Sequence, residues 1–542
     1  MRQVWKIGIA GQWTRFTVLI MISLCAGVIT AAQPVLTGMV IQSVEQESSR
    51  STTTLCFILI GVFLTESVLQ FGIAFFSGKT GEDFIYSLRQ HSIRLISNLQ
   101  LGVKQNLEHA DLHSRVLTDT ALANSVFIGT IPRAVNTLML SVGCIVGMLI
   151  TIPTLFAVIV FIFAVTSGIA FLISKLLKKQ YSKNRADSVQ LSATLWQIIN
   201  SLPAFKAKNA EPWILNRFSN AAGEARDSAT RVDVTAGLLM PVLNIGTQAC
   251  IIVALLLTAT GTARGELTSS QSTMFLMFLL YSVSPLVELG SMASTASSGL
   301  ASIERLKVLW ELQLERSDGQ AIERLTTPTV LKFNNTGYSF PDSDYPVIEK
   351  FNAELKGPGI YLLRGPNGRG KSTLLHLANG TYPSSGIISI GDHEISQVAL
   401  SSWRDNVLLI PQDREPISGT LRDNLGAGGN YTDSQRIQAI QTSGFSKHYT
   451  DLDLPISGDT GIDLSGGQRA LLALSDAILR NPPILLLDEI TAGIDKETLP
   501  HIRNLLSRMG ENHLIVAVSH DDSLSDLARG EITLPIESTV KI

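Results

Sequence analysis

The hydrophobic and polar positions of the chain divide it into two regions with different patterns. Long apolar runs occupy most of residues 1–300, whereas short apolar stretches alternate with amphipathic ones from Thr329 onward. A run of about 20 apolar residues is long enough to cross a bilayer as a helix, while a buried strand needs only about 5. The pattern therefore predicts a membrane-spanning helical bundle followed by a globular α/β domain.

About six apolar segments have the length of a membrane-spanning helix. They are expected at residues 16–40, 53–77, 135–152, 155–173, 237–259 and 272–289. The long connections between them carry lysine and arginine throughout, so the positive-inside tendency places these connections in the cytoplasm. An even number of crossings then leaves both chain ends on the cytoplasmic side.

The two long connections, residues 78–134 and 174–236, are charged and rich in helix-forming residues. They are predicted to be helices that continue out of the membrane rather than loops. Pro212 in the second connection suits a helix start or a break. Helices that project into the cytosol can contact another domain.

Glu66 lies near the middle of the second predicted span. A carboxylate at that depth is costly unless it faces a cavity or a partner, so Glu66 is a candidate contact for a transported cargo. A protonated carboxyl that packs between helices is an equally good interpretation, because buried carboxyl groups are readily neutralised.

Composition and charge support the interpretation that the chain is a membrane protein. Charged residues are 16% of the 542 residues, against about 25% in ordinary soluble proteins, and hydrophobic residues are 45%. The net charge of −3 gives no basis for nucleic-acid binding, so no nucleic-acid partner is expected. The four cysteines all lie in apolar runs, which predicts small buried side chains and no disulfide or metal site. They are Cys25, Cys56, Cys144 and Cys250.

The globular region is predicted to contain a parallel sheet, because short β-rich stretches alternate with helical ones. These stretches are residues 330–333, 360–363, 407–410, 484–487 and 514–518. The charged segment 301–328 before them, which ends in Thr-Thr-Pro, is the expected linker.

A glycine-rich segment directly after the stretch 360–363 fits the pattern G-x-x-x-x-G-K-[ST] between a strand and a helix. Glycines in such a loop expose backbone N–H groups to phosphates, the lysine reaches the terminal phosphates and the serine binds Mg²⁺. The residues expected to bind a nucleotide here are Gly365, Asn367, Gly368, Gly370, Lys371, Ser372 and Thr373. Ser372 is also the expected metal ligand.

A second motif, Asp488-Glu489, follows the apolar stretch 484–487. Carboxylates at the end of a central parallel strand lie beside the phosphate loop. Asp488 is therefore expected to hold the metal, and Glu489 to polarise the attacking water.

The segment Leu464-Ser465-Gly466-Gly467-Gln468 lies between these two motifs. It is similar to the LSGGQ signature of ATP-binding cassette (ABC) ATPases. Six spans followed by one cassette resemble the half-transporters of the exporter type, and this resemblance covers essentially the whole chain. It implies a transmembrane domain at 1–300, a linker at 301–328 and a nucleotide-binding domain at 329–542, with ATP and Mg²⁺ as cofactors.

The resemblance also assigns roles to four further residues. Gln412 resembles the Q-loop glutamine, with a catalytic and metal-binding role, and His520 resembles the catalytic switch histidine. Phe340 stands where the family stacks an aromatic ring on adenine, and Asp495 is similar to the aspartate of the D-loop. Arg369 and Phe340 depart from the commoner residues at their positions, but no catalytic group is missing. A competent hydrolytic site is therefore expected.

In this family Ser465 and Gly467 contact the ATP that the opposite cassette holds. The resemblance therefore implies a dimer, either of two identical chains or of this chain with a related one. It favours export of a small molecule, peptide or lipid through a bacterial inner (plasma) membrane, with the cassette in the cytoplasm. An importer with exporter-like architecture, as in some siderophore systems, and an ATP-gated channel or receptor are the alternatives.

Overall fold

The computed structural model describes residues 2–9, 11–103, 109–326, 329–341, 343, 345–457, 461–519 and 522–534. The chain divides into two compact units. The first, here called the helical unit, comprises Met1–Ser92 and Ala110–Leu309. The second, the cassette unit, comprises Ile93–His109 and Trp310–Ile542.

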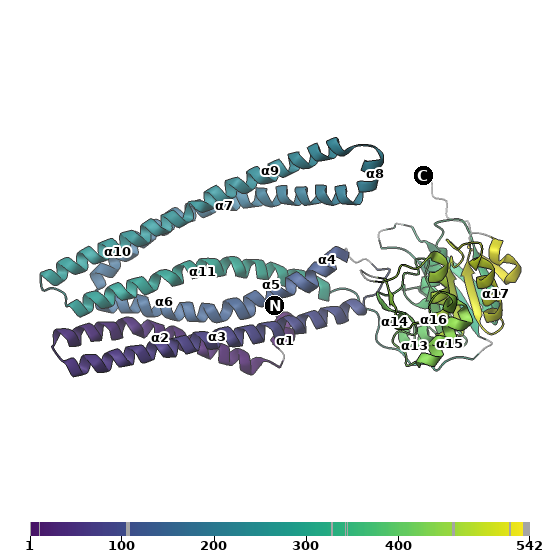
Figure 1. Ribbon diagram of the computed structural model, residues 1–542, viewed down its shortest axis with the longest axis horizontal. Coiled ribbons are helices and arrows are strands. Elements are labelled where there is room, and N and C mark those ends of the chain that lie inside the picture. The colour runs from purple at the N-terminus through teal and green to yellow at the C-terminus, as the bar shows by residue number, and fades with distance from the viewer. Residues whose placement is uncertain are drawn as a thin grey trace. The chain divides into compact units, whose positions relative to one another are not determined.

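The helical unit contains long helices joined by short turns (Figure 1). Its helices are α1 (Arg2–Ile9), α2 (Trp13–Glu45), α3 (Ser49–Ser97), α4 (His109–Ser114), α5 (Thr120–Asn124), α6 (Ile131–Thr151), α7 (Pro153–Asn200), α8 (Leu202–Ala207), α9 (Glu211–Gly237), α10 (Leu239–Ala263) and α11 (Ser269–Trp310), with π-helical stretches η1 (Arg115–Asp119) and η2 (Ser125–Thr130). Six helical spans in the described residues are long and apolar enough to cross a membrane, which confirms the predicted number.

Several of these helices are far longer than a membrane requires. Helix α3 has 49 residues, α7 has 48 and α11 has 42, whereas about 20 residues span the hydrocarbon core. The expectation that the long connections continue as helices is confirmed, and α9 begins at Glu211 with Pro212 in its first turn. Helix α11 continues to Trp310, so residues 301–310 of the predicted linker are helical.

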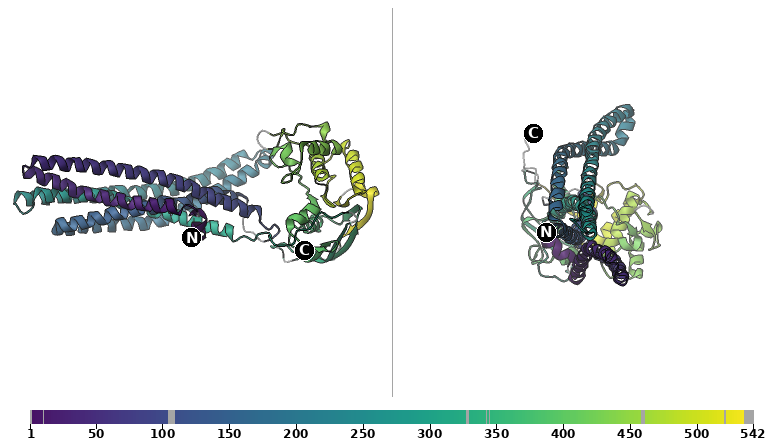
Figure 2. Two further views of the ribbon diagram at one scale, coloured as in Figure 1. Left: turned by 90° about the horizontal axis from the view of Figure 1, so that it is seen from below. Right: turned by 90° about the vertical axis from the view of Figure 1, so that its left-hand side faces the viewer.

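Within the helical unit, α7 packs along α9 and α10, while α2 packs along α6. Figure 1 and the right-hand view of Figure 2 show α7 and α9 side by side and diverging from α2, α3, α6 and α11. The two groups converge where α6 turns into α7, around an apolar core that includes Met148, Leu155, Cys250 and Phe275.

Burial of the cysteines is predicted correctly for Cys144 and Cys250 and wrongly for Cys25 and Cys56, which are exposed. The error has a physical cause. In a membrane helix an apolar run does not require burial against protein, since lipid tails are as apolar as the core.

The cassette unit is built on three sheets and a set of short helices. The five-stranded sheet is parallel, in the order β11 (Ala528–Thr533), β3 (Gly359–Arg364), β10 (Leu514–Val518), β9 (Ile484–Asp488) and β6 (Val407–Ile410). The four-stranded sheet is antiparallel, in the order β2 (Ile348–Lys356), β1 (Val330–Tyr338), β4 (Ser385–Ile390) and β5 (His393–Glu394). A two-stranded sheet pairs β7 (Gly419–Thr420) with β8 (Pro455–Ile456).

The helices of the cassette unit follow the strands in sequence. They are α12 (Lys371–Asn379), α13 (Leu400–Asn406), α14 (Leu421–Asn424), α15 (Asp433–Ser443), α16 (Gly466–Arg480) and α17 (Thr498–Gly510), with 3₁₀ turns η3 (Phe445–Lys447) and η4 (Asp522–Leu527). The predicted α/β fold with a parallel sheet is confirmed, with one correction. The stretch 330–333 belongs to the antiparallel sheet, where β1 alternates between buried and exposed positions at its start. Strands β9 and β10 are instead buried at every position, as expected for a sheet covered on both faces.

The register of the parallel sheet aligns the strand ends that carry the predicted chemistry. Val518 at the end of β10 pairs with Leu363 on one side and with Asp488 on the other. The loop after β3 and the carboxylates after β9 therefore emerge at the same edge of the sheet.

Candidate functional site

The phosphate loop connects β3 to α12. Gly370 caps the helix in the left-handed conformation, with φ of +85°, and a Cβ there would lie 2.7 Å from Val347 Cγ1. Lys371 is buried and its Nζ donates hydrogen bonds to the carbonyl oxygens of Gly365 (2.8 Å) and Pro366 (3.0 Å). The loop thus curls around the lysine at the start of a helix, where free N–H groups and the helix dipole favour an anion.

Asp488 lies at the end of β9 and is 3% exposed. Burial raises the pKa of Asp488 above its ordinary value, against a hydrogen bond from Ser372 that lowers it, while the charge of Glu489 raises it further. The Oδ1 atom of Asp488 is buried without a hydrogen-bond partner in the described structure. An unpartnered carboxylate oxygen beside a serine hydroxyl fits the oxygen ligands that Mg²⁺ prefers.

Glu489 and Gln412 meet directly. The Gln412 side-chain amide donates to Glu489 Oε2 at 2.9 Å. Glu489 has φ of +50°, an uncommon conformation for a residue with a side chain, and its N–H donates to Val518 O at 3.1 Å. The structure therefore joins the predicted Q-loop to the predicted catalytic carboxylate, while His520 lies outside the described residues.

Phe340 belongs to an aromatic cluster beside this site. Its ring centroid lies 5.0 Å from that of Tyr338 and 6.1 Å from that of Tyr382, both in edge-to-face arrangements. Tyr382 in turn stacks on His376 at 4.7 Å. Burial lowers the pKa of His376, although the charge of Asp488 raises it.

Sequence reasoning identified only Phe340 of this cluster. Tyr382 follows the helix that the phosphate loop begins, two residues after its capping Gly380, and that position is the signal that could have found it.

The signature segment starts a helix. Ser465 is the N-cap of α16, and its hydroxyl accepts from the Gln468 backbone N–H at 3.3 Å while Gln468 Oε1 accepts from the Ser465 N–H at 2.9 Å. A Cβ on Gly466 would lie 2.5 Å from Gly493 O, and one on Gly467 would lie 3.1 Å from Asp495 Oδ2. Glycine therefore lets the signature approach the segment after β9 closely.

The Asp495 carboxylate accepts hydrogen bonds from nearby residues of its own chain. Its Oδ1 accepts from the backbone N–H groups of Thr498 (2.7 Å) and Glu497 (3.1 Å), and these bonds, with that of the Thr498 hydroxyl, lower its pKa. It thus stabilises the turn before α17, and its contact with a nucleotide stays a prediction.

The predicted site residues fall into two groups. Ser372, Asp488, Glu489 and Gln412 are joined by contacts beside the phosphate loop, whereas the signature glycine Gly467 approaches Asp495. Ser465 makes its side-chain and N–H hydrogen bonds within the first turn of its own helix. In the described residues, the contacts of the signature thus lie within α16 and beside the segment after β9, whereas Ser372 and the carboxylates meet beside the phosphate loop.

Glu66 takes part in a polar network between three helices of the helical unit. Thr30 of α2 donates to Glu66 Oε1 at 2.8 Å, and the amide of Gln33 donates to the other carboxylate oxygen. The Tyr281 hydroxyl of α11 donates to Gln33 Oε1 at 2.6 Å. Glu66 thus links α2 and α3, and through Gln33 α11, whether or not it also contacts a cargo.

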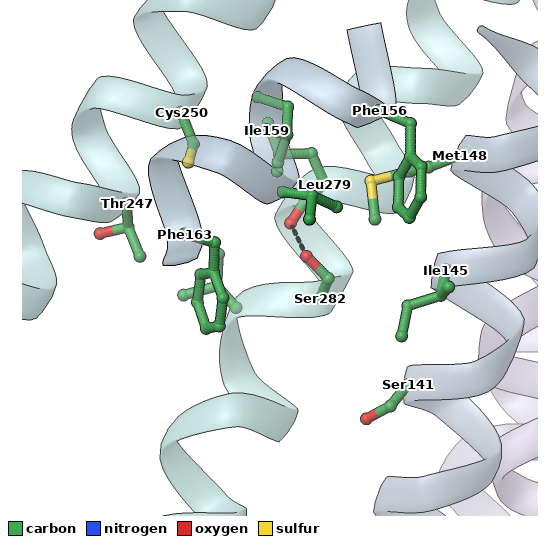
Figure 3. A pocket seen from close by; sticks show the side chains of 12 residues that line it. Ser141, Ile145, Met148, Phe156, Ile159, Phe163, Thr247, Cys250, Leu279 and Ser282 are labelled. Atoms are coloured by element: carbon green, nitrogen blue, oxygen red, sulfur yellow. Dashed lines mark hydrogen bonds between the residues drawn. The ribbon is translucent and has the colours of Figure 1, made fainter. Parts of the chain in front are cut away.

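An apolar cavity of about 190 Å³ lies between α6, α7, α10 and α11 (Figure 3). None of its lining residues is charged, and the Ser282 hydroxyl is satisfied by Leu279 O at 2.7 Å. The lining residues are Ser141, Ile145, Met148, Phe156, Ile159, Val160, Phe163, Thr247, Cys250, Leu279, Ser282 and Val283. Such a surface favours an apolar group over an ion.

Two family models match the chain. The model described as "ABC transporter transmembrane region" matches residues 16–286, which is half of the chain, and the model described as "ABC transporter" matches residues 348–492. The chain belongs to the ABC transporter family.

This ABC transporter is similar to proteins with several names. A multidrug resistance ABC transporter ATP-binding and permease protein of Lactococcus lactis is 24% identical over 88% of this chain and 82% of its own length. An ATP-dependent lipid A-core flippase 2 of Colwellia psychrerythraea is 24% identical over 91% of this chain and 85% of its own length. A chloroplastic ABC transporter B family member 29 of Arabidopsis thaliana is 26% identical over 86% and 75%.

The ABC transporter described here is a half-transporter of the exporter type, a multi-pass membrane protein that joins six spans to one ATP-binding cassette. It is an ATP hydrolase coupled to transport, and its family implies a dimer. These conclusions agree with the predictions drawn from the motifs.

Proposed function

We propose that this ABC transporter is a homodimer that exports a small molecule, peptide or lipid with an apolar part. The observation that carries the proposal is the set of contacts of the signature residues. Ser465 bonds within α16 and Gly467 approaches Asp495, whereas Gln412 and Glu489 meet at the end of β9. Two copies that face each other would bring each signature to the phosphate loop of the other copy.

Within each site the side chains have distinct tasks. Lys371 and the N–H groups of the phosphate loop hold the phosphates, with the ring of Phe340 against the base. Ser372, Asp488 and Gln412 would hold Mg²⁺, which when bound neutralises phosphate charge during hydrolysis. Glu489 orients and polarises the attacking water.

Two further groups complete the proposed reaction. The amide of Gln412 donates to Glu489 Oε2 and so orients the carboxylate that would accept a proton from water. His520 is assigned to the same reaction by its resemblance to the switch histidine.

The uncharged cavity supports an apolar portion in the cargo. Its lining of Phe156, Ile159 and Phe163 from α7 faces Met148 from α6 without any charged residue. The names of two relatives, a multidrug resistance transporter and a lipid A-core flippase, point to the same broad class of cargo. Glu66 lies in the polar network near α2 and is the candidate contact for a cationic group on that cargo.

We place the protein in a bacterial inner (plasma) membrane with its cassette in the cytoplasm. The basic connections after the second and fourth spans support this orientation. Two of the relatives described above are bacterial, and the third is chloroplastic.

The experiment that tests the proposal is a cargo screen on the full chain in lipid nanodiscs, with ATP turnover as the readout. An apolar cargo is expected to raise turnover in the wild type and to have no effect in the Glu489→Gln variant. Stimulation by charged, fully polar compounds alone would contradict the proposed cargo class.

A further inference from the structure

Arg414 bridges two loops at the hydrolytic site. Its Nε donates to Gln412 O at 3.1 Å, its Nη1 to Ile490 O at 2.8 Å and its Nη2 to Ala492 O at 3.0 Å. Together with the bond from the Gln412 amide to Glu489, three hydrogen bonds connect residues 412–414 to residues 489–492, and the Arg414–Gln412 bond fixes the turn on which Arg414 lies. The carbonyls that the two Nη atoms hold belong to the first and third residues after Glu489.

The geometry of Arg414 suits this bridging role. A guanidinium is a rigid planar fork, so it can hold several carbonyl oxygens at once in a fixed arrangement, which a lysine cannot. Arg414 also has φ of +43°, a left-handed conformation that costs free energy in a residue with a side chain. Favourable contacts elsewhere must offset that cost.

Arg414 is also a half-buried positive charge near the two carboxylates. Partial burial lowers the pKa of the guanidinium, and the charge of Arg469 lowers it further, whereas Glu489 and Asp488 raise it. An arginine nevertheless stays protonated in proteins, so the hydrogen bonds that Arg414 donates are charge-assisted.

We propose that Arg414 is a positioning residue for ATP hydrolysis, which fixes the backbone after Glu489 and keeps the Glu489 carboxylate aimed. This inference rests on the catalytic role proposed for Glu489. The residues after Glu489 form a loop rather than a strand, so their carbonyl groups depend on side-chain donors. Without Arg414, Glu489 would keep its bond from Gln412 but lose the anchor that follows it in the chain.

The test measures steady-state ATP turnover of the full chain in nanodiscs, over a range of ATP concentration. Arg414→Gln is expected to lower kcat roughly 10- to 100-fold, because a small misplacement of a catalytic group has that effect. The KM for ATP should change less than about twofold, because Arg414 makes no bond to the phosphate loop in the described structure.

A lysine variant separates the charge of Arg414 from its shape. Arg414→Lys keeps the charge and loses the planar fork, so it should also lower kcat while the KM for ATP stays close to that of the wild type. If the glutamine variant fails to fold, a loss of kcat at unchanged KM in the lysine variant supports the positioning role, and a wild-type kcat in the lysine variant overturns it.

Arg436→Gln is the matched control. Arg436 of α15 also caps backbone carbonyls, those of Leu425 (3.0 Å) and Tyr431, but it does so away from Glu489. This variant should show a kcat and a KM close to those of the wild type.

Glu489→Gln, measured in parallel, distinguishes a failure of the catalytic role of Glu489 from a failure of the positioning role of Arg414. Normal turnover in that variant would overturn the catalytic assignment itself. An inactive Glu489→Gln with wild-type kcat in both Arg414 variants would overturn only the positioning role. Equal losses of kcat in the Arg414 and Arg436 variants would likewise reduce Arg414 to a structural residue.

Discussion

At the scale of single residues, directed hydrogen bonds hold the side chains of the candidate hydrolytic site. The Gln412 amide donates to Glu489 at 2.9 Å, and the Lys371 ammonium donates to two loop carbonyls within 3.0 Å. We propose that the lysine binds phosphate, whereas Glu489 acts on the attacking water. Substitutions at the two positions should therefore have different effects.

We expect Glu489→Gln to lower ATP turnover by about 10² or more while ATP binding stays close to that of the wild type. The substitution removes the group that activates water and no contact to phosphate. Lys371→Ala should instead weaken ATP binding itself. Nucleotide binding and steady-state turnover, both measured in nanodiscs, check this pair, and normal turnover in the glutamine variant would refute the role of Glu489.

The Glu66 network gives a second prediction at this scale. If Glu66 binds a cationic group of the cargo, Glu66→Gln should lower the ratio of cargo-stimulated to basal turnover, because the amide keeps the volume and loses the charge. Expression should be little changed, since an amide can still bond to Thr30 and Gln33. An unchanged ratio would leave Glu66 with its packing role alone.

At the scale of elements, an ion pair connects the π-helical stretch η1 to the last long helix. Arg305 of α11 donates hydrogen bonds to the Asp119 carboxylate of η1 from Nε at 2.9 Å and from Nη2 at 2.5 Å. Arg115 donates to Arg305 O at 2.8 Å. Asp119 is 1% exposed. The pair therefore connects the C-terminal part of α11 to the helices between the second and third spans.

We expect Asp119→Asn to lower the free energy of unfolding by about 1–3 kcal/mol, because it removes a charge-assisted contact in a buried place. Lys307→Gln is the matched control, since the Lys307–Glu304 pair on the same helix is more exposed and should contribute less than about 1 kcal/mol. Thermal denaturation of both variants in detergent gives the comparison. Equal stability of the two variants would refute the importance of the Asp119 pair.

The spacing of residues within continuous motifs was enough to predict the elements that hold the nucleotide-binding and catalytic residues. It did not predict the features that arise from tertiary contacts. The phosphate loop and the strand before Asp488 were predictable because each motif is continuous in the chain. The bridging role of Arg414 and the stacking of Tyr382 on His376 were not, because their partners are distant in sequence or defined only by packing. The position of residues 330–333 in an antiparallel sheet was missed for the same reason.

At the scale of the whole molecule, each hydrolytic site of the proposed dimer needs the phosphate loop of one chain and the signature of the other. A Ser465→Arg homodimer should lose nearly all ATP turnover, because each site would face a bulky cation in the other signature. A dimer of one Ser465→Arg chain and one Lys371→Ala chain retains one intact composite site, so its turnover should reach at most about half that of the wild type. Full turnover from an isolated monomeric cassette would contradict the shared site.

The most direct test of ATP-driven export is the direction of flux in membrane vesicles. Inside-out vesicles that contain the full chain are given an apolar fluorescent cargo, with ATP supplied on the cassette side. The account predicts ATP-dependent accumulation of the cargo inside these vesicles and none with Glu489→Gln. Accumulation in the opposite direction, or equal flux with the Glu489→Gln variant, would contradict it.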